Sequence, residues 1–312
     1  MKKPALIILG LLLLAFISIY YIIPQNIIAK SVVNIDGTDA NVAKFIIEQR
    51  SWKKWWPGSH NGDDSTVYTN NGVIYKLLKS TNGDIQVQIK KGDKILDSHI
   101  TYLAVADGET QVTWYASQQS SLNIFGRIAG FVKIKEIQTE MSSLLSHFKQ
   151  FMQKDVNVYG MKVNLKKVTD ETMLATNTTT KTYPTTANVY SLIANVKKQI
   201  AAKGVKESNQ PMLNIFKVDN NEYQVMVAIP INKAIMPDAG YVVNHMLKGG
   251  NILEAEVKGG RKTIDNAMAQ LKNYTRDHHL TPPAMPYELI ITDRQAQTDT
   301  AKWITKIYYP IF

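Results

Sequence analysis

The apolar positions of this chain follow two spacings, which alternate along its length. Apolar residues at every second position are typical of strands, and apolar residues three or four apart are typical of one face of a helix. In the first half, residues 27–35 are predicted as a strand. Gly37, Thr38 and Asp39 then predict a turn that caps a short helix. A tryptophan-rich segment at residues 51–58 follows and is predicted as an aromatic loop.

The pattern then predicts an antiparallel sheet closed by one long helix. Turn signals at 81–83, 91–93 and 106–108 separate the runs, which makes hairpin connections the expected ones. The four strand-like runs are residues 72–79, 84–90, 94–105 and 110–117. A helix is predicted at 134–154, where apolar residues fall on one face.

The second half contains an internal repeat. Residues 188–201 match residues 263–276 at a shift of 75 positions, and both segments have the spacing of an amphipathic helix. Each is preceded by an extended run, at 162–178 and 240–257. Each is followed by two predicted strands, at 213–218 and 223–229 in the first copy and at 287–292 and 302–309 in the second. Two strand–helix–strand–strand units in tandem predict a pseudo-twofold domain with one antiparallel sheet and both helices on one of its faces.

The residues Ala5 to Ile23 carry no charge over nineteen positions. As a helix they would span roughly 28 Å, which is enough to cross the hydrocarbon core of a bilayer. Lys2 and Lys3 precede this segment, so the positive-inside rule predicts a cytoplasmic N-terminus and an extracytoplasmic, periplasmic position for the rest. A cleaved signal peptide is the alternative, but no good cleavage site follows. We therefore expect residues 1–24 to form a single-pass membrane anchor.

The length and composition of the chain limit the number of domains and the classes of function. A length of 312 residues corresponds to about two domains. The absence of cysteine excludes disulfides, thiol nucleophiles and metal sites with cysteine ligands. The net charge of +10 is spread along the chain, which is a weak signal for nucleic-acid binding, and no nucleic-acid partner is predicted.

Residues 26–155 resemble the START-like (SRPBCC, or polyketide cyclase-like) superfamily. The resemblance rests on residues 31–34, on the segment from Arg50 to Pro57 and on residues 122–127. It implies a helix-grip fold, in which a curved sheet wraps a long helix and leaves a cavity for an apolar ligand. Trp56 and Trp114 are candidate contacts for that ligand, while core packing is the alternative for these clustered aromatic residues.

Residues 156–312 resemble the GyrI-like domain, also called the AraC-type effector-binding domain. The matching residues are 255–260, 286–289 and 308–311. In that family a strand glutamate faces the ligand groove, and by position this glutamate is Glu288. The family often follows a helix-turn-helix domain, but here the START-like domain takes that place. The fold class predicted for the chain is therefore α+β, with these two domains behind one transmembrane helix.

The strand pattern around Glu288 is a second, independent reason to expect that it binds a ligand. A carboxylate in the apolar run Tyr287 to Ile291 is costly unless it meets a cation or a donor. Trp303 and Tyr309, on the last strand, add aromatic groups that suit a planar cation. The candidate ligand-binding residues are thus Glu288, Trp303, Tyr309 and Tyr287, and a solvated position on the sheet is the alternative for Glu288.

No histidine has metal-ligand spacing and no phosphate-loop or nucleophile motif occurs, so no metal, no cofactor and no catalytic residue is predicted. Residues 258–262 precede a helix and could hold an anion, with a plain turn as the alternative.

The chain is expected to bind a small hydrophobic or amphipathic molecule, cationic ones included, and to sense or sequester it at a membrane. The alternative is a hydrolase or cyclase in which Glu288 serves as general base.

Overall fold

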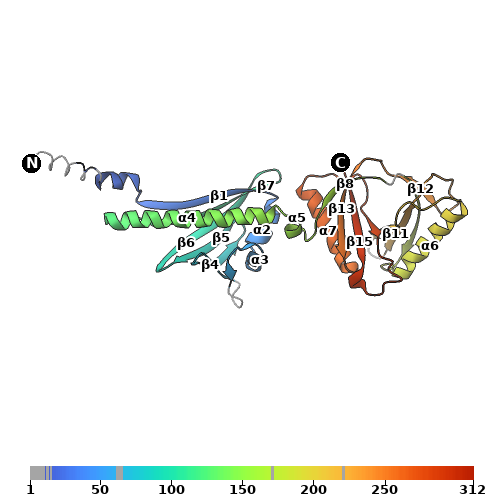
Figure 1. Cartoon of the computed structure of the whole chain (residues 1–312), viewed down its shortest axis with the longest axis horizontal. Coiled ribbons are helices and arrows are strands. Elements are labelled where there is room, and N and C mark those ends of the chain that lie inside the picture. The colour runs from blue at the N-terminus through green and yellow to red at the C-terminus, as the bar shows by residue number, and fades with distance from the viewer. Residues whose placement is uncertain (1–10, 12–13, 15, 61–65, 170–171, 220–221) are drawn as a thin grey trace, which may run out of the picture. The chain divides into compact units, whose positions relative to one another are not determined.

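The computed structural model describes residues 11, 14, 16–60, 66–169, 172–219 and 222–312. Two units separate after Lys154, and Figure 1 shows the elements of each.

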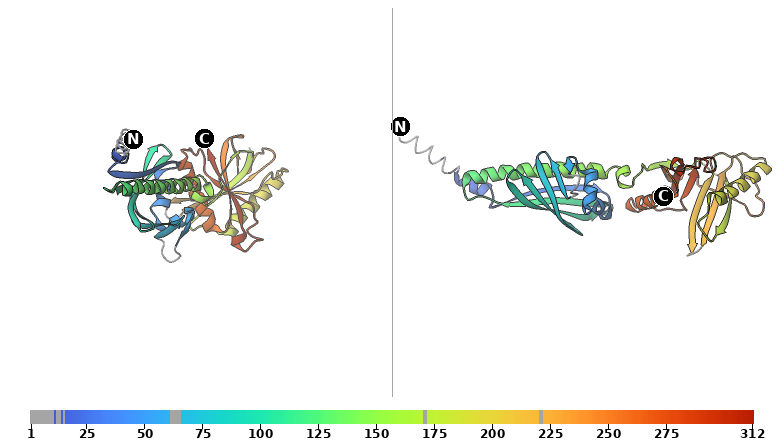
Figure 2. Two further views of the ribbon diagram at one scale, coloured as in Figure 1. Left: turned by 60° about the vertical axis from the view of Figure 1, so that its left-hand side comes forward. Right: turned by 90° about the horizontal axis from the view of Figure 1, so that it is seen from below.

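The first unit is built on a seven-stranded antiparallel sheet with the order β1-β7-β6-β5-β4-β3-β2. Buried and exposed residues alternate along β1 and β7, which is the pattern of a sheet with one covered face. Figure 2 shows the helix α4 lying along this sheet. The strands are β1 (Asn26–Asp36), β2 (Ser59–His60), β3 (Val67–Asn70), β4 (Val73–Thr81), β5 (Asp84–Lys91), β6 (Lys94–Ala106) and β7 (Glu109–Gln119). The helices are α2 (Asp39–Ile46), α3 (Gln49–Trp55) and α4 (Ile124–Met152).

Two local predictions for this unit are wrong. The tryptophan segment is not a loop, because residues 49–55 form α3. The indole Nε1 atoms of Trp52 and Trp55 donate to backbone oxygens at the end of α2, which fixes this turn of helix against it. The long helix begins ten positions earlier than predicted, at Ile124, because Asn123 caps it by accepting hydrogen bonds from two backbone N–H groups. The cap predicted at Thr38 is confirmed.

The predicted membrane anchor lies partly outside the described residues, which begin at 11 and omit 12–13 and 15. Within the described residues, no helix combines the length and the apolar character needed to cross a membrane.

The second unit contains an eight-stranded antiparallel sheet with the order β12-β9-β11-β10-β14-β15-β13-β8. The helices α6 and α7 pack on one of its faces, in two separate apolar clusters: one of Ile, Leu and Val under α6, and one of Ile, Leu, Ala, Met and Tyr under α7. The strands are β8 (Asn164–Lys167), β9 (Thr172–Thr180), β10 (Met212–Asp219), β11 (Glu222–Pro230), β12 (Val242–His245), β13 (Asn251–Lys258), β14 (Tyr287–Ile290) and β15 (Ile304–Ile311). The helices are α5 (Asp155–Val158), α6 (Thr186–Ala202) and α7 (Arg261–Asp277), with a short 3-10 turn at Thr300–Lys302.

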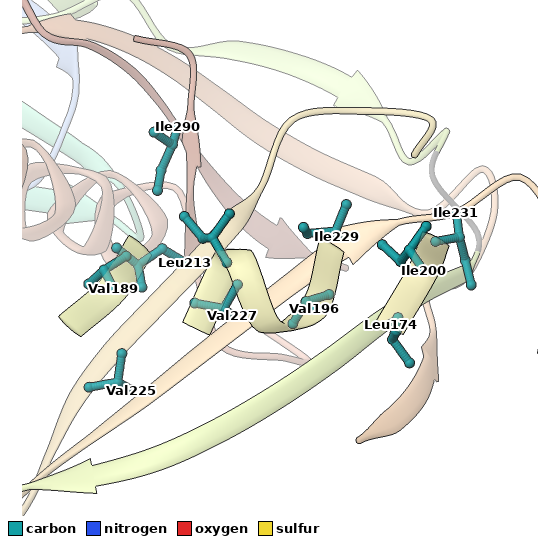
Figure 3. Packing of buried hydrophobic residues seen from close by; sticks show 11 residues of the cluster. Leu174, Val189, Val196, Ile200, Leu213, Val225, Val227, Ile229, Ile231 and Ile290 are labelled. Atoms are coloured by element: carbon teal, nitrogen blue, oxygen red, sulfur yellow. The ribbon is translucent and has the colours of Figure 1, made fainter. Parts of the chain in front are cut away.

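The sheet order confirms the internal repeat. The first copy contributes β9-β11-β10 and the second contributes β14-β15-β13, so that the two copies meet at β10 and β14. Figure 3 shows the core of the first copy, in which Val196 of α6 lies beside Val227 and Ile200 of α6 lies near Leu174. A short strand precedes each copy in the chain and pairs with the other copy. The strand β8, before the first copy, pairs with β13 of the second, and β12, before the second copy, pairs with β9 of the first.

Candidate functional site

The carboxylate of Glu288 is buried at the junction of the two repeats and is held by two arginines. Its side chain lies on the helix-covered face of β14, and the residue is 2% exposed. Oε2 accepts from Arg294 Nη2 at 2.9 Å, and Oε1 accepts from Arg261 Nη1. Because a buried carboxylate needs a cation, these two guanidinium groups explain how Glu288 is tolerated in an apolar strand.

Arg294 lies in the loop between β14 and β15 and is fixed on several sides. Nη2 also donates to Thr305 Oγ1 at 2.9 Å, and the backbone N–H donates to the Tyr190 hydroxyl at 2.6 Å. The guanidinium carbon lies 5.0 Å from the ring centroid of Trp303, which is a cation–π distance. The Nε atom is buried and has no hydrogen-bond partner among the described residues.

Arg261 approaches the same carboxylate from the first residue of α7. Its Nε donates to Asp265 Oδ1 at 2.8 Å, and its guanidinium carbon lies 5.2 Å from the ring centroid of Tyr183. Burial alone would lower the pKa of Arg261, but the hydrogen bond to Asp265 and the charge of Glu288 outweigh it and raise the pKa. The group is therefore charged at any physiological pH.

A cavity of about 240 Å³ opens beside these arginines. Three aromatic rings, two guanidinium groups, two threonines and several aliphatic side chains form its wall. The lining residues are Tyr183, Pro184, Thr185, Thr186, Val189, Tyr190, Leu213, Ile215, Arg261, Arg294 and Trp303. Glu288 is not among them, so the wall offers donors and aromatic faces, with the carboxylate behind the arginines.

Both tyrosines of this cavity remain neutral phenols. Burial raises the pKa of Tyr183, against the opposing charge of Arg261. Burial also raises the pKa of Tyr190, although the hydrogen bond from the backbone of Arg294 opposes the shift. The Tyr190 hydroxyl already accepts from the Arg294 backbone N–H and is hydrogen-bonded to the Asp293 carboxylate, so the Tyr183 hydroxyl is the more available one for a polar group in the cavity.

The structure brings together only two of the four residues predicted for this site. Glu288 and Trp303 both contact Arg294. Tyr309 is 7% exposed and packs in the core under α7. Tyr287 lies on the other face of the sheet, where its ring stacks on Tyr308 at 5.3 Å. Neighbouring residues of a strand point to opposite faces, which separates Tyr287 from Glu288.

Trp56 and Trp114, the candidates in the first unit, lie in an aromatic cluster. Trp114 is 0% exposed, and its Nε1 donates to Ser98 Oγ at 3.0 Å. Trp56 stacks on Trp52 with a centroid distance of 5.6 Å and contacts Tyr75. These ring contacts correspond to the packing alternative for the two tryptophans.

Sequence reasoning missed the two arginines and the two tyrosines of the cavity. The cost of a buried carboxylate indicated that a cation had to lie nearby, but the chain has 36 lysines and arginines and no local pattern that selects one. Arg261 belongs to the segment 258–262 that was considered for anion binding, and it binds the carboxylate of this chain. Within the described residues, no group of three or more histidines and carboxylates is placed to hold a metal ion.

No protein-family model matches the chain, and a search of curated proteins finds no significant match. Among solved structures, the C-terminal domain of EcmrR matches 49% of this chain and 98% of its own, with a TM-score of 0.42 and 15% identity. The di-domain ARO/CYC BexL from the BE-7585A biosynthetic pathway matches 91% of this chain and 84% of its own, with a TM-score of 0.35 and 10% identity. A hydrolase from Listeria innocua matches 49% of this chain and 92% of its own, with a TM-score of 0.37 and 9% identity. At these identities and TM-scores, none of the three likenesses identifies a family or an activity for this chain.

Proposed function

We propose that residues 155–312 bind a small, planar, amphipathic molecule in the cavity between Tyr183, Arg294 and Trp303. The observation that carries this proposal is the wall of the cavity, in which aromatic faces and buried donors surround about 240 Å³ of space. Small-molecule sites commonly combine an apolar wall with a few fixed polar groups. The role of the protein would be to sense or to sequester such a compound.

The arginines also bear on the chemistry of the ligand. Both oxygens of Glu288 already accept hydrogen bonds from guanidinium groups, so a cationic ligand would have to displace an arginine to reach the carboxylate. A ligand with an acceptor oxygen finds donors in the wall, because the residues Arg261 and Arg294 both line the cavity. This favours an aromatic carboxylate over the cationic ligand expected from the sequence.

The same contacts weaken the enzyme alternative. A general base must accept a proton from a water or from a substrate within hydrogen-bond reach. Each oxygen of Glu288 is occupied by an arginine, and the residue does not line the cavity. Binding therefore has more support than hydrolysis or cyclisation with Glu288 as the base.

Calorimetric titration of the full chain with naphthoate and with naphthylmethylammonium tests the proposal. The two probes share an aromatic body and differ in the sign of their charge. We expect naphthoate to bind, and to bind about tenfold more weakly to Arg294→Lys, because a lysine cannot keep the planar array of donors. The exposed Arg50→Lys is the matched control and should bind as the parent chain does. The proposal is overturned if neither probe binds, or if both arginine variants lose affinity equally.

We also propose that residues 5–23 anchor the chain in a membrane as a single span, with the two units outside the cytoplasm. The support is the uncharged segment and the two lysines before it. Fractionation followed by protease treatment of intact spheroplasts tests this. Recovery of the chain in the carbonate-washed membrane fraction, and its digestion from outside, are the expected results. Recovery in the wash or full protection from the protease would contradict them.

A further inference from the structure

The face of the eight-stranded sheet opposite α6 and α7 carries a groove with two arms. Its apolar arm has a volume of about 210 Å³, and its polar arm has a volume of about 170 Å³. Both arms are lined by Met212, Met246 and Tyr287, so they meet at these residues. Taken together, the arms fall in the range of roughly 300–1,000 Å³ that small-molecule sites occupy.

Methionine dominates the apolar arm. Five of the 11 methionines in the chain line it. They are Met173, Met212, Met226, Met246 and Met285. Met173, Met212 and Met226 lie on β9, β10 and β11, and on the opposite face these three strands carry Leu174, Leu213, Val225, Val227 and Ile229, which pack against α6.

This contrast between the faces points to binding. The two faces belong to the same strands, so the difference in composition does not come from strand propensity. Branched residues give a fixed core, whereas the flexible and polarizable methionine side chain adapts to different apolar partners. Met285 is 54% exposed, so the arm is open to the solvent at that residue.

A buried acceptor lies in the floor of the apolar arm. Asn214 donates through Nδ2 to the carbonyl oxygen of Pro286 at 2.6 Å. Its Oδ1 is buried and has no hydrogen-bond partner among the described residues. An unsatisfied acceptor of this kind costs about 1–3 kcal/mol, so this part of the sheet is less suited to core packing than the opposite face.

The polar arm is positively charged at its outer end. Lys166 and Lys167, on the edge strand β8, line it together with Glu254. The carboxylate of Glu254 is already compensated, because Tyr308 donates to it at 2.6 Å and Lys306 lies 3.5 Å from it. Lys166 is the ladder partner of Ile252, on the groove face, and within the described part of the chain it is paired with no carboxylate. Lys167, its neighbour on the strand, points to the other face, where it donates to the Asn251 side chain at 2.6 Å. An anion at this end would therefore meet the ammonium group of Lys166.

We propose that this groove is a second ligand site, which takes an acyl-chain amphiphile with one anionic head group. The acyl chain occupies the methionine arm, and the carboxylate or phosphate lies beside Lys166. The site is independent of the cavity beside Arg294, because it lies on the other face of the sheet and shares only Leu213 with the residues that line that cavity.

Photo-crosslinking of the full chain tests the position of this site. Decanoate that carries a diazirine is irradiated with the protein, and the labelled peptides are identified by mass spectrometry. We expect labels on the peptides that contain Met212, Met226 or Met246. Excess decanoate should compete with the label, and decyltrimethylammonium, which has the opposite charge, should not. Labels spread over other peptides, or equal competition by the cation, would overturn the proposal.

A pair of charge reversals tests the head-group end. Lys166→Glu should weaken decanoate binding by about tenfold and leave naphthoate binding unchanged. The matched control is Lys198→Glu, which reverses an exposed lysine on α6. Equal losses of affinity in the two variants would mean attraction by net charge alone and would overturn the proposal.

The same label distinguishes two sources of the anion. Stronger competition by decanoate than by lysophosphatidate assigns the groove to a free acid, and stronger competition by lysophosphatidate assigns it to a membrane lipid. Absence of competition by both contradicts the site. Naphthoate binding reports separately on the first cavity, so a failure at one site is not confused with a failure at the other.

Discussion

Leu213 and Glu288 occupy equivalent positions in the two repeats, 75 residues apart, and are direct partners in the ladder between β10 and β14. The pseudo-twofold axis of the domain therefore passes between a leucine and a glutamate. Both side chains lie on the helix-covered face, but only the glutamate requires compensation by charge. The two arginines that supply it, Arg261 and Arg294, both come from the second repeat.

The Glu288–Arg294 pair is expected to show strong coupling in a double-mutant cycle. Removing Glu288 leaves the Arg294 guanidinium buried without its carboxylate, and should cost about 3–5 kcal/mol of unfolding free energy, whereas Arg294→Met should cost somewhat less because Arg261 still pairs with Glu288. The double variant should cost clearly less than the sum, because it removes both charges. Urea denaturation of the four proteins gives the cycle, and additive costs would show that the pair is not coupled.

Tyr183→Leu should separate binding from stability. The ring covers Arg261 at the edge of the cavity and is 38% exposed, so its loss should cost only about 0.5–1 kcal/mol of stability. Naphthoate affinity should fall severalfold, because one aromatic wall of the cavity is gone. Tyr115 has the same exposure, so Tyr115→Leu is the matched control. Unchanged affinity in Tyr183→Leu would remove this ring from the site.

Ser98→Ala tests whether Trp114 belongs to the packed core of the first unit. Ser98 Oγ accepts from Trp114 Nε1 and donates to the carbonyl oxygen of Val87. Without it the indole N–H is buried and unpaired, which should cost about 1–3 kcal/mol. Ser117→Ala, at an exposed position of β7, is the control. Thermal unfolding compares the two, and equal midpoints would argue for an accessible indole.

Asp293 should make the stability of the loop that carries Arg294 depend on pH in the acid range. Backbone N–H groups of Gln295 and Ala296 donate to its carboxylate and lower its pKa below the usual 3.8. A lowered folded-state pKa means that the stabilisation is present above pH 3.8 and is lost as the pH falls through the folded value. Asp293→Ala should therefore be less stable than the parent at neutral pH, and the difference should shrink below pH 3.8. Denaturation at pH 7 and at pH 3 measures both, and a constant difference would contradict the assignment.

The local pattern of the sequence was sufficient for most of the fold. The repeat, its helices α6 and α7, and the strands β4 to β7 were predicted because strand and helix periods depend on near neighbours in the chain. The same reasoning missed α3, whose short turn of helix depends on two indole hydrogen bonds to α2. It also placed the start of α4 too late, because the apolar face of the helix begins well after its cap at Asn123.

The sequence by itself determined that Glu288 lies in an apolar strand and needs a cation, and that two similar units pair. Only the tertiary structure decided which cations are used, because Arg261 and Arg294 reach the carboxylate from a helix start and from a loop. It also decided that Tyr287 and five methionines share a groove on the other face, since residues from distant strands become neighbours only when the sheet forms. Periodicity is a property of adjacent residues, whereas a site is assembled from residues far apart in the chain, and this difference sets the limit of what the sequence alone could predict.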